Sequence, residues 1–474
     1  MSLLLPQAPP SRLPDPQPDN GNRLIRRAIA ASAMGNAAEW YDYGVYAAVA
    51  TYLTEAFFPE PLGSIGTMLG FAVSFVLRPL GGMVWGAIGD RIGRKSVLVT
   101  TILLIASATT LMGVLPTYAT AGAWAPLFLI ILRVVQGFSA GGEYGGAATF
   151  IAEYAPDTKR GRYGCFLEFG TLGGFVFGNA VVLSLEAMLS HEQMVGWGWR
   201  VPFFVALPLG LIGLVLRSRI DDTPVFKEFS ARKAVNGRAT TGFVDLVSTY
   251  ARPVMVMFAM VVALNVTSYT LLTYQPTYLH ATIGLGERSR TTVILVGELV
   301  MMACIPFAGA LSDRIGRKPM WRRSMLGLCV LALPMYWLMG QGFGWAIIGF
   351  AVLGLLFIPQ LATVSATFPA MFPTQVRYAG FAISYNVATT LFGGTAPLVA
   401  DTVIDSTGWR LFPAVYLMLA CAIGLAALPY MRETAGCSIR GTDIPGVEPE
   451  LERELARIAP ATVPIHTPIP AFRV

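Results

Sequence analysis

Twelve long apolar segments follow one another along the chain, and they limit its possible folds more than any other feature. Each has about 20 residues or more, enough for a helix to cross a hydrocarbon core of roughly 30 Å. In lipid, backbone polar groups must be satisfied within the segment, so helices are predicted. The segments lie near residues 28–52, 65–89, 96–115, 126–151, 163–186, 199–217, 253–279, 289–311, 321–340, 343–366, 377–400 and 408–430. The sequence therefore predicts an all-α membrane protein with twelve transmembrane helices.

Composition and charge agree with a membrane protein. The 474 residues are 54% hydrophobic and 13% charged, and the mean hydropathy is +0.58. The net charge of +6 does not indicate a nucleic-acid partner, because Lys and Arg gather in alternate connections between spans. By the positive-inside rule, this distribution places both termini in the cytoplasm. The basic connections include "RLIRR" (23–27), "DRIGRK" (90–95), "DTKRGR" (157–162) and "DRIGRKPMWRR" (313–323).

Two echoes in the sequence indicate an internal repeat. "GDRIGRKSV" (89–97) returns as "SDRIGRKPM" (312–320), and "PDTKR" (156–160) returns as "PTQVR" (373–377). Similar offsets predict two six-helix halves related by a parallel pseudo-two-fold axis along the membrane normal. Such halves can rock about a central site, although duplication without transport is the alternative. The predicted parts are a disordered cytoplasmic leader (1–22), the N-terminal half (23–217), a cytoplasmic linker (218–250), the C-terminal half (251–431) and a cytoplasmic tail (432–474).

No motif indicates an enzyme. The chain has no metal-ligand spacing, Walker glycine loop or nucleophile triad, so we expect neither a cofactor nor a metal site nor ATP-driven pumping. The three histidines lie in loops or in the tail, which argues against a histidine proton relay. The five cysteines have no paired spacing and are expected to be small buried hydrophobes.

Ionisable residues inside the spans are the strongest functional signal. Each costs about 2.5 to 3.5 kcal/mol near the bilayer centre, so it needs a partner, a cavity or neutralisation. The first half contains Glu39, Asp42, Arg78, Arg133, Glu143 and Glu168. In the second half Glu298 is the only deep one, and we expect it to be structural or interfacial.

The first span combines acids with aromatic residues on one face. Glu39, Asp42, Tyr43 and Tyr46 follow helical spacing, and Trp40 flanks them. The two acids lie roughly 17 to 21 Å from the inner face, and Arg78 of the second span reaches a similar depth. Arg78 is therefore expected to pair with one acid, which leaves the other as a candidate proton carrier. A purely structural ion pair is the alternative, and the sequence does not assign the two acids.

Three further spans contribute candidates. Arg133 and Gln136 share one face of the fourth span, Glu143 follows Gln136 by two turns, and Glu168 begins the fifth span at a similar depth. These two acids are expected to flank one cavity, or else to tie helix ends together. In the seventh span, Asn265, Tyr269 and Tyr274 accompany Pro276. Aromatic faces stabilise a cation by about 0.5 to 2 kcal/mol each, so these residues are candidates for binding a cationic group. The simpler alternative is that they pack in an ordinary helix interface.

The motifs resemble a known family. The "DRIGRK" loops, the doubled layout and "RVVQG" (133–137) are similar to the major facilitator superfamily. Five longer stretches resemble its metabolite:proton symporter branch. They are "GNAAEWYDYGVY" (35–46), "LRPLGG" (77–82), "QGFSAGGEYGGA" (136–147), "WGWRVPFF" (197–204) and "FPAMFPTQVRY" (368–378). "NVTSYTLLTYQPTYL" and "FLEFGT" are most similar to proline/betaine osmoprotectant symporters. The resemblance covers about residues 24–434 and implies a monomeric, multi-pass carrier in the bacterial inner membrane.

The resemblance also implies roles for particular residues. Arg133 matches the position linked in the superfamily to proton handling, and the fifth span lacks the Gly-Pro kink associated with antiporters. The short tail lacks the long coiled coil of some osmosensing relatives, which puts that form of regulation in doubt. The inner gate latch would comprise Asp90, Arg91, Gly93, Arg94 and Lys95, with Asp313, Arg314, Gly316, Arg317 and Lys318 as its counterpart.

The leading hypothesis is a proton-coupled importer of a zwitterion such as proline, glycine betaine or ectoine, working by alternating access in a lipid bilayer. A second hypothesis is a symporter for a di- or tricarboxylate, since Arg133 could supply a second cation. A third is a solute receptor that binds its ligand without transporting it. The proton-coupling candidates are Glu39, Asp42, Arg133, Glu143 and Glu168. The substrate-binding candidates are Trp40, Tyr43, Tyr46, Arg78, Asn265, Tyr269 and Tyr274.

Overall fold

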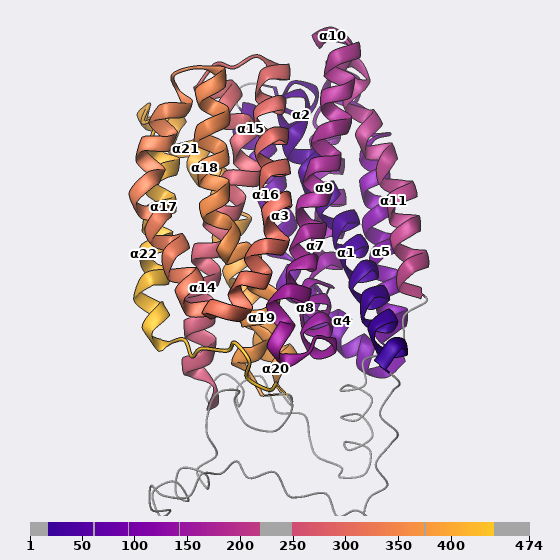
Figure 1. Ribbon diagram of the computed structural model, residues 1–474. Helices are drawn as coiled ribbons and strands as arrows, with labels where there is room; N and C mark the ends of the chain where they lie inside the picture. The colour runs from indigo at the N-terminus through magenta and orange to yellow at the C-terminus, as the bar shows by residue number, and fades with distance from the viewer. Residues whose placement is uncertain are drawn as a thin grey trace, which may run out of the picture.

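The computed structural model describes residues 18–59, 62–92, 94–141, 143–218, 249–373 and 376–439. All regular structure in these ranges is helical, which confirms the predicted fold class. Figure 1 shows two groups of upright helices side by side, one from indigo to magenta and one from pink to yellow.

The helices of the first group are α1 (Pro18–Ala48), α2 (Ala50–Phe57), α3 (Gly63–Val76), α4 (Arg78–Ile92), α5 (Arg94–Met112), α6 (Tyr118–Ala121), α7 (Trp124–Ala140), α8 (Glu143–Tyr154), η1 (Asp157–Lys159), α9 (Arg160–Met188), α10 (His191–Gly196), η2 (Gly198–Arg200) and α11 (Val201–Ser218). Those of the second group are α14 (Ala251–Ser268), η3 (Tyr269–Tyr274), α15 (Gln275–Thr277), η4 (Tyr278–Thr282), α16 (Glu287–Ile315), α17 (Arg317–Met339), α18 (Phe343–Leu361), α19 (Val364–Thr367), η5 (Pro369–Met371), α20 (Arg377–Ala388), η6 (Thr389–Gly393), α21 (Ala396–Thr407), α22 (Phe412–Ala427) and η7 (Leu428–Tyr430).

Each of the twelve predicted spans falls on a helix or on consecutive helices. Within the described part of the chain, nine helices are long and apolar enough to cross a membrane. The other three predicted spans correspond to α1 with α2, to α5 and to α17. The first is interrupted near Val49, the apolar part of α5 is short (Val99–Met112), and α17 begins with basic residues.

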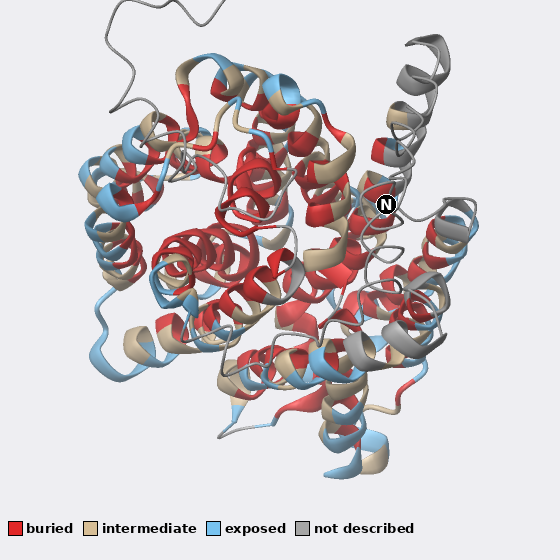
Figure 2. Ribbon diagram, turned by 90° about the horizontal axis from the view of Figure 1, so that it is seen from below, coloured by how far each residue is buried: buried red, intermediate tan, exposed pale blue. Residues whose placement is uncertain are grey.

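Buried and exposed residues are distributed as expected for helices surrounded by lipid. Viewed along the bundle, buried residues gather on the inner sides of the helices and exposed residues on the outside (Figure 2). Large apolar side chains are among the exposed ones, including Phe307, Val330 and Trp337. Exposing such side chains to water would cost free energy, whereas exposing them to lipid hydrocarbon does not.

The two groups meet along α9 and α16, which lie side by side in the centre of Figure 1. Contacts also join α3 to α21, α4 to α20, and α8 to both α19 and α20. We call the end of the bundle where α11 ends and α14 begins the linker face. The opposite end, which includes α10, is the far face.

Glycines bring α7 close to the second span. A Cβ atom on Gly137 would lie 1.5 Å from the carbonyl oxygen of Ser74, and one on Gly141 would lie 2.0 Å from that of Arg78. Side chains larger than hydrogen are therefore excluded at both positions. This backbone contact sets the position of Arg78 relative to α7.

The seventh span changes its helical form around Pro276. It is α-helical to Ser268, and the segments η3 and η4 on either side of α15 are π-helical. Proline cannot donate a backbone hydrogen bond inside a helix, and π-helical turns are frequent at functional sites. The predicted disturbance by Pro276 therefore begins earlier, at Tyr269.

Most of the predicted leader, linker and tail lies outside the described residues. The exceptions are short. Helix α1 already begins at Pro18, so residues 18–22 are helical rather than disordered as predicted. Proline is favoured in the first turn of a helix, where its missing N–H is not needed.

Candidate functional site

An ion pair links the first and second spans at the centre of the bundle. Nη2 of Arg78 lies 3.5 Å from Oε1 of Glu39 and donates a hydrogen bond of 2.8 Å to the hydroxyl of Tyr43. All three side chains are buried. The structure thus contains the ion pair predicted from matched depth, with Glu39 as the partner.

The second acid of the first span is also paired, so the prediction that one acid would be left over is wrong. Nη1 of Arg133 lies 3.3 Å from Oδ2 of Asp42 and donates to Oε1 of Gln136 at 2.9 Å. Gln136 in turn donates to the hydroxyl of Thr109 at 2.7 Å. The prediction counted Arg133 as a separate candidate, whereas α7 turns it toward α1.

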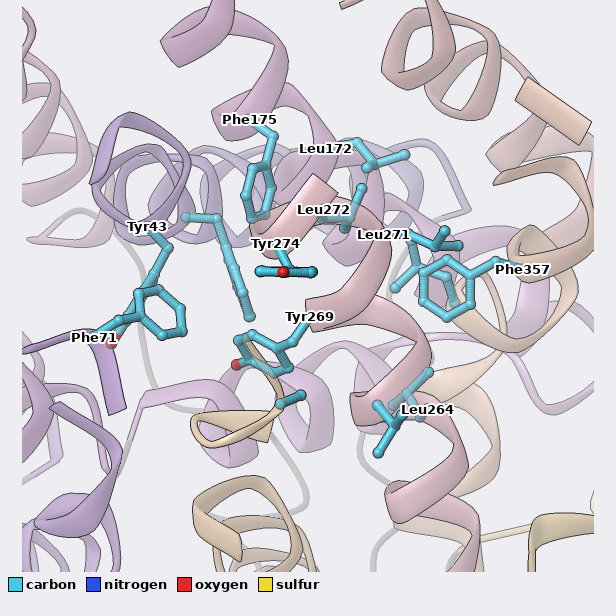
Figure 3. Close-up of a cluster of buried hydrophobic side chains, with 14 of the residues drawn as sticks. Tyr43, Phe71, Leu172, Phe175, Leu264, Tyr269, Leu271, Leu272, Tyr274 and Phe357 are labelled. Atoms are coloured by element: carbon cyan, nitrogen blue, oxygen red, sulfur yellow. The ribbon is translucent and has the colours of Figure 1, made fainter. Parts of the chain in front are cut away.

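An aromatic cluster adjoins the Glu39–Arg78 pair and includes both halves. Trp40 and Tyr43 of α1 lie with their ring centroids 5.5 Å apart, and Tyr269 of η3 lies 6.2 Å from Trp40 and 5.2 Å from Phe75. Figure 3 shows Tyr43, Phe71 and Tyr269 together at this point. We call Trp40, Tyr43, Phe71, Phe75 and Tyr269 the aromatic cluster.

Both central arginines contact the faces of aromatic rings. The guanidinium carbon of Arg78 lies 4.6 Å from the ring centroid of Phe75, and that of Arg133 lies 3.9 Å from the ring centroid of Tyr46. The hydroxyl of Tyr46 donates to the carbonyl of Thr67. Tyr46 therefore supports Arg133, and its ring also lies 6.0 Å from that of Phe71 in the aromatic cluster.

Two donors in the aromatic cluster have no hydrogen-bond partner among the described residues. They are the indole Nε1 of Trp40 and the hydroxyl of Tyr269, both buried. Buried donors usually have a partner in a folded protein. Unpaired donors between two halves are expected where a ligand supplies the acceptor.

The acids of the fourth and fifth spans occupy different surroundings. Glu168 accepts hydrogen bonds from Tyr144 and, at 3.0 Å, from Thr171. Glu143 lines a cavity inside the first half together with Glu39. Glu168 is not among the residues that line this cavity, and its side chain is directed to Tyr144.

The candidates of the seventh span are separated by its change of helical form. Only Tyr269 reaches the aromatic cluster. Asn265 donates to Thr389 in η6 at 2.8 Å, and Tyr274 donates to Asp401 in α21 at 3.2 Å. Both contacts remain within the second half.

Glu298 lies at the interface between the halves, as expected. Nδ2 of Asn179 in α9 donates to both of its carboxyl oxygens, at 3.0 and 3.2 Å. The contact joins α9 to α16 midway between the two faces.

At the linker face, a carboxylate ties the halves together. Asp313 accepts hydrogen bonds of 2.8 Å from the main-chain N–H groups of Gly161 and Arg162, which begin α9, and forms an ion pair of 2.6 Å with Arg317. An anion at a helix N-terminus is favourable because the free N–H groups there point toward it.

Other residues of the predicted latch surround this tie. Gly316 has a φ of +94°, a conformation that favours glycine. The main-chain N–H groups of Arg317 and Lys318 donate to Glu433, while Arg314 is exposed. Gly93 and the side chains of Asp90, Arg91, Arg94 and Lys95 lie outside the described residues.

At the far face, several side chains connect the halves. Arg290 of α16 lies 3.5 Å from the buried carboxylate of Glu186 in α9, which also accepts from Tyr52. Exposed His191 bridges Glu287 of α16 at 2.5 Å and Glu55 of α2 at 3.2 Å. The central residues are therefore separated from both faces by contacts between the halves.

Two residues of the aromatic cluster that the sequence analysis did not single out are phenylalanines. Phe71, Phe75 and Arg78 lie on one helical face, because Phe75 follows Phe71 by four residues and Arg78 follows Phe75 by three. That spacing is a usable signal, but phenylalanine is so common in membrane spans that it did not single them out.

Comparison with known proteins assigns the fold and these motifs to a family. The model of the Major Facilitator Superfamily matches residues 33–395. The chain belongs to this superfamily. It is similar to the proton:xylose symporter XylE, whose structure superposes with a TM-score of 0.70 and 18% identity over 88% of this chain and 98% of that one. At this identity the likeness shows the fold alone.

Several curated relatives are much more similar in sequence. The glycine betaine/proline/ectoine/pipecolic acid transporter OusA of Dickeya dadantii is 39% identical, over 88% of this chain and 85% of that protein. The proline/betaine transporter of Escherichia coli is 38% identical with the same coverage. The ectoine/proline transporter ProP of Corynebacterium glutamicum is 38% identical, over 91% of this chain and 88% of that protein.

Proposed function

We propose that this chain is a proton-coupled secondary transporter that imports a small zwitterionic osmoprotectant of the proline, glycine betaine and ectoine class. The observation that carries the proposal is the buried Glu39–Arg78 ion pair beside an aromatic cluster built from both halves. The printed activities of the relatives support the substrate class.

The site offers a partner for each end of a zwitterion. The carboxylate of the substrate would replace Glu39 on Arg78 and accept from Trp40 or Tyr269, whose donors have no partner among the described residues. The ammonium group would lie against the ring faces of the aromatic cluster, where a desolvated cation gains about 2 kcal/mol or more. Both charges of the substrate would thus be compensated inside the bundle.

Protonation of Glu39 would couple substrate binding to the proton. A buried carboxylate without its cation is costly, so Glu39 becomes easier to protonate when a substrate carboxylate takes Arg78. One proton and one zwitterion would then enter together. Asp42 with Arg133 is a second acid–arginine pair in the same half, and Glu143 and Glu168 are further proton-coupling candidates.

The ties at the two faces would provide alternating access. Asp313 would act with Arg317 and Lys318 at the linker face, while Glu186 and Arg290 would act at the far face. The basic connections favour an orientation with the linker face and both termini in the cytoplasm of a bacterium. The functional unit would be a monomer, since the site lies within one chain.

A membrane potential of about 100 mV would contribute roughly 2.3 kcal/mol per proton. This corresponds to about fiftyfold accumulation of a neutral zwitterion. The direct test is uptake of proline and glycine betaine by proteoliposomes with an imposed pH gradient. Glu39→Gln should reduce proton-driven accumulation at least tenfold, whereas Glu192→Gln at an exposed position of α10 should not.

An organic-acid symporter is the second candidate, because Arg133 is a further buried cation. Arg133 is however engaged by Asp42 and Gln136, which disfavours a second anionic site. Uptake of citrate or 2-oxoglutarate in preference to proline and betaine would overturn the zwitterion proposal. Binding of substrate without counterflow would indicate a receptor.

A further inference from the structure

A small cavity of about 20 Å³ lies inside the first half, between α1, α5, α8 and α11. It is separate from the aromatic cluster, and none of its lining residues comes from the second half. Glycine and alanine at five lining positions leave the space between these helices. They are Gly35, Ala38, Ala106, Ala206 and Gly210.

Three polar side chains line the cavity. They are Glu39 of α1, Thr109 of α5 and Glu143 of α8. A bound water molecule needs two to four polar partners and about 10 to 15 Å³ of cavity volume, so the cavity can hold one. A purely apolar cavity stays dry, so these three side chains decide what it can hold.

The cavity is connected to both acid–arginine pairs. Glu39 lines it and also forms the ion pair with Arg78. The hydroxyl of Thr109 lines it and accepts from Gln136, which accepts from Arg133 beside Asp42. A change of charge within the cavity is therefore transmitted to Arg78 directly and to Arg133 through two hydrogen bonds.

We propose that this cavity is a water-binding site through which the proton reaches Glu39, apart from the path of the substrate. This inference rests on the proposed function. The carboxylic acid of Glu143 gives a proton to a bound water, and that water gives a proton to the carboxylate of Glu39. Glu143 is then a carboxylate and Glu39 a neutral acid, which frees Arg78 for the carboxylate of the substrate.

Two routes within one half have a physical advantage. The proton does not have to cross the aromatic cluster while the substrate occupies it. Glu39 is the point at which the routes meet, since it faces the cavity and also touches the arginine that would hold the substrate.

The test fills the cavity without changing any charged residue. Ala106→Leu enlarges a side chain in the wall formed by α5, and Ala206→Leu does so from α11. Ser107→Leu is the matched control, because Ser107 is the next residue of α5 and is exposed. Each variant is reconstituted in proteoliposomes. Proline counterflow without a pH gradient and accumulation driven by an imposed pH gradient are then measured.

In counterflow the proton can stay on Glu39 in both directions, so the cavity route is used only for net proton movement. We therefore expect both cavity variants to keep wild-type counterflow and to lose at least tenfold of proton-driven accumulation, while Ser107→Leu keeps both activities. Retained counterflow shows that a variant is folded, and with two variants the test survives misfolding of one. Wild-type proton-driven accumulation in a variant with counterflow would overturn the proposed cavity route but not the function. Absence of proton-driven accumulation in the wild type would instead overturn the proposed function.

Discussion

Replacing Asp313 by asparagine should open the linker face. Asp313 accepts hydrogen bonds from two main-chain N–H groups of the other half, each 2.8 Å long. A hydrogen bond to a charged group contributes about 1.5 to 3 kcal/mol net. The ion pair with Arg317 lies within one half, so it is not counted among the contacts that hold the two halves together.

The expected magnitude follows from what asparagine retains. Its amide oxygen still accepts one hydrogen bond, but without charge, and its amide nitrogen cannot accept the other. We therefore expect a loss of about 2 kcal/mol in the closed state, which raises the open population about thirtyfold.

Native Cys165 offers a direct assay. Its side chain is buried at the linker end of α9, and a Cβ atom on Gly309 of α16 would lie 2.6 Å from its sulfur. Alkylation therefore requires the halves to separate, and its rate follows the open population when opening is fast. Mass spectrometry of the peptide containing Cys165 measures this rate after treatment with a maleimide.

The control is Asp405→Asn, which removes the same charge from an exposed position of α21. We expect Asp313→Asn to accelerate alkylation of Cys165 about thirtyfold, and Asp405→Asn to leave it unchanged. An unchanged rate in Asp313→Asn, or equal acceleration in both variants, would refute the assignment of Asp313 as a tie between the halves.

Three further predictions concern the other contacts. Glu186→Gln leaves Arg290 buried without its anion and should destabilise the protein by about 3 to 5 kcal/mol, seen as a lower midpoint in thermal denaturation, whereas exposed Glu192→Gln should have no effect. Gly137→Ala should abolish the folded yield, because its Cβ would lie 1.5 Å from the carbonyl oxygen of Ser74. Gly173→Ala, where no atom lies within 4 Å, should raise stability by about 1 kcal/mol; similar yields for both variants would contradict the packing argument. The hydrogen bond that His191 donates to Glu287, assisted by the charge of Glu55, raises the pKa of His191. The stabilising contact of His191 with Glu287 and Glu55 is therefore fully present below the free histidine pKa of about 6.5. It is lost as pH rises through the raised pKa of His191 in the folded protein. Tyr52, whose ring lies 6.0 Å from that of His191, also contacts the charged side chains of Glu186 and Arg290. Spin labels at positions 188 and 286 should show a longer distance at high pH, and His191→Gln should remove this dependence.

Depth within the membrane could be predicted from the sequence because helical rise is constant. Counting residues from the ends of two spans was enough to place Glu39 and Arg78 at one height. The neighbour toward which a side chain points is harder to predict, since it depends on how the surrounding helices pack. The sequence therefore did not show that Arg133 turns toward Asp42.

Contacts between distant segments were predicted least well. Tyr269 reaches Trp40 and Phe75 only because the two halves close around the centre, and no local pattern contains that information. The cavity was not predicted either, because it forms where several small residues from different helices leave the space between them unfilled. Gly35, Ala106 and Gly210 look like ordinary small residues of membrane helices until their spans are placed together.

Two of the contacts between the halves differ in the kind of atom that forms them, and this affects how each can change in evolution. At the far face, Glu186 and Arg290 meet through their side chains, so a substitution on either side alters that contact. At the linker face, Asp313 binds main-chain N–H groups of Gly161 and Arg162. Every residue except proline supplies that group. The tie made by Asp313 therefore depends on one variable side chain, whereas the contact between Glu186 and Arg290 can be adjusted gradually from both sides.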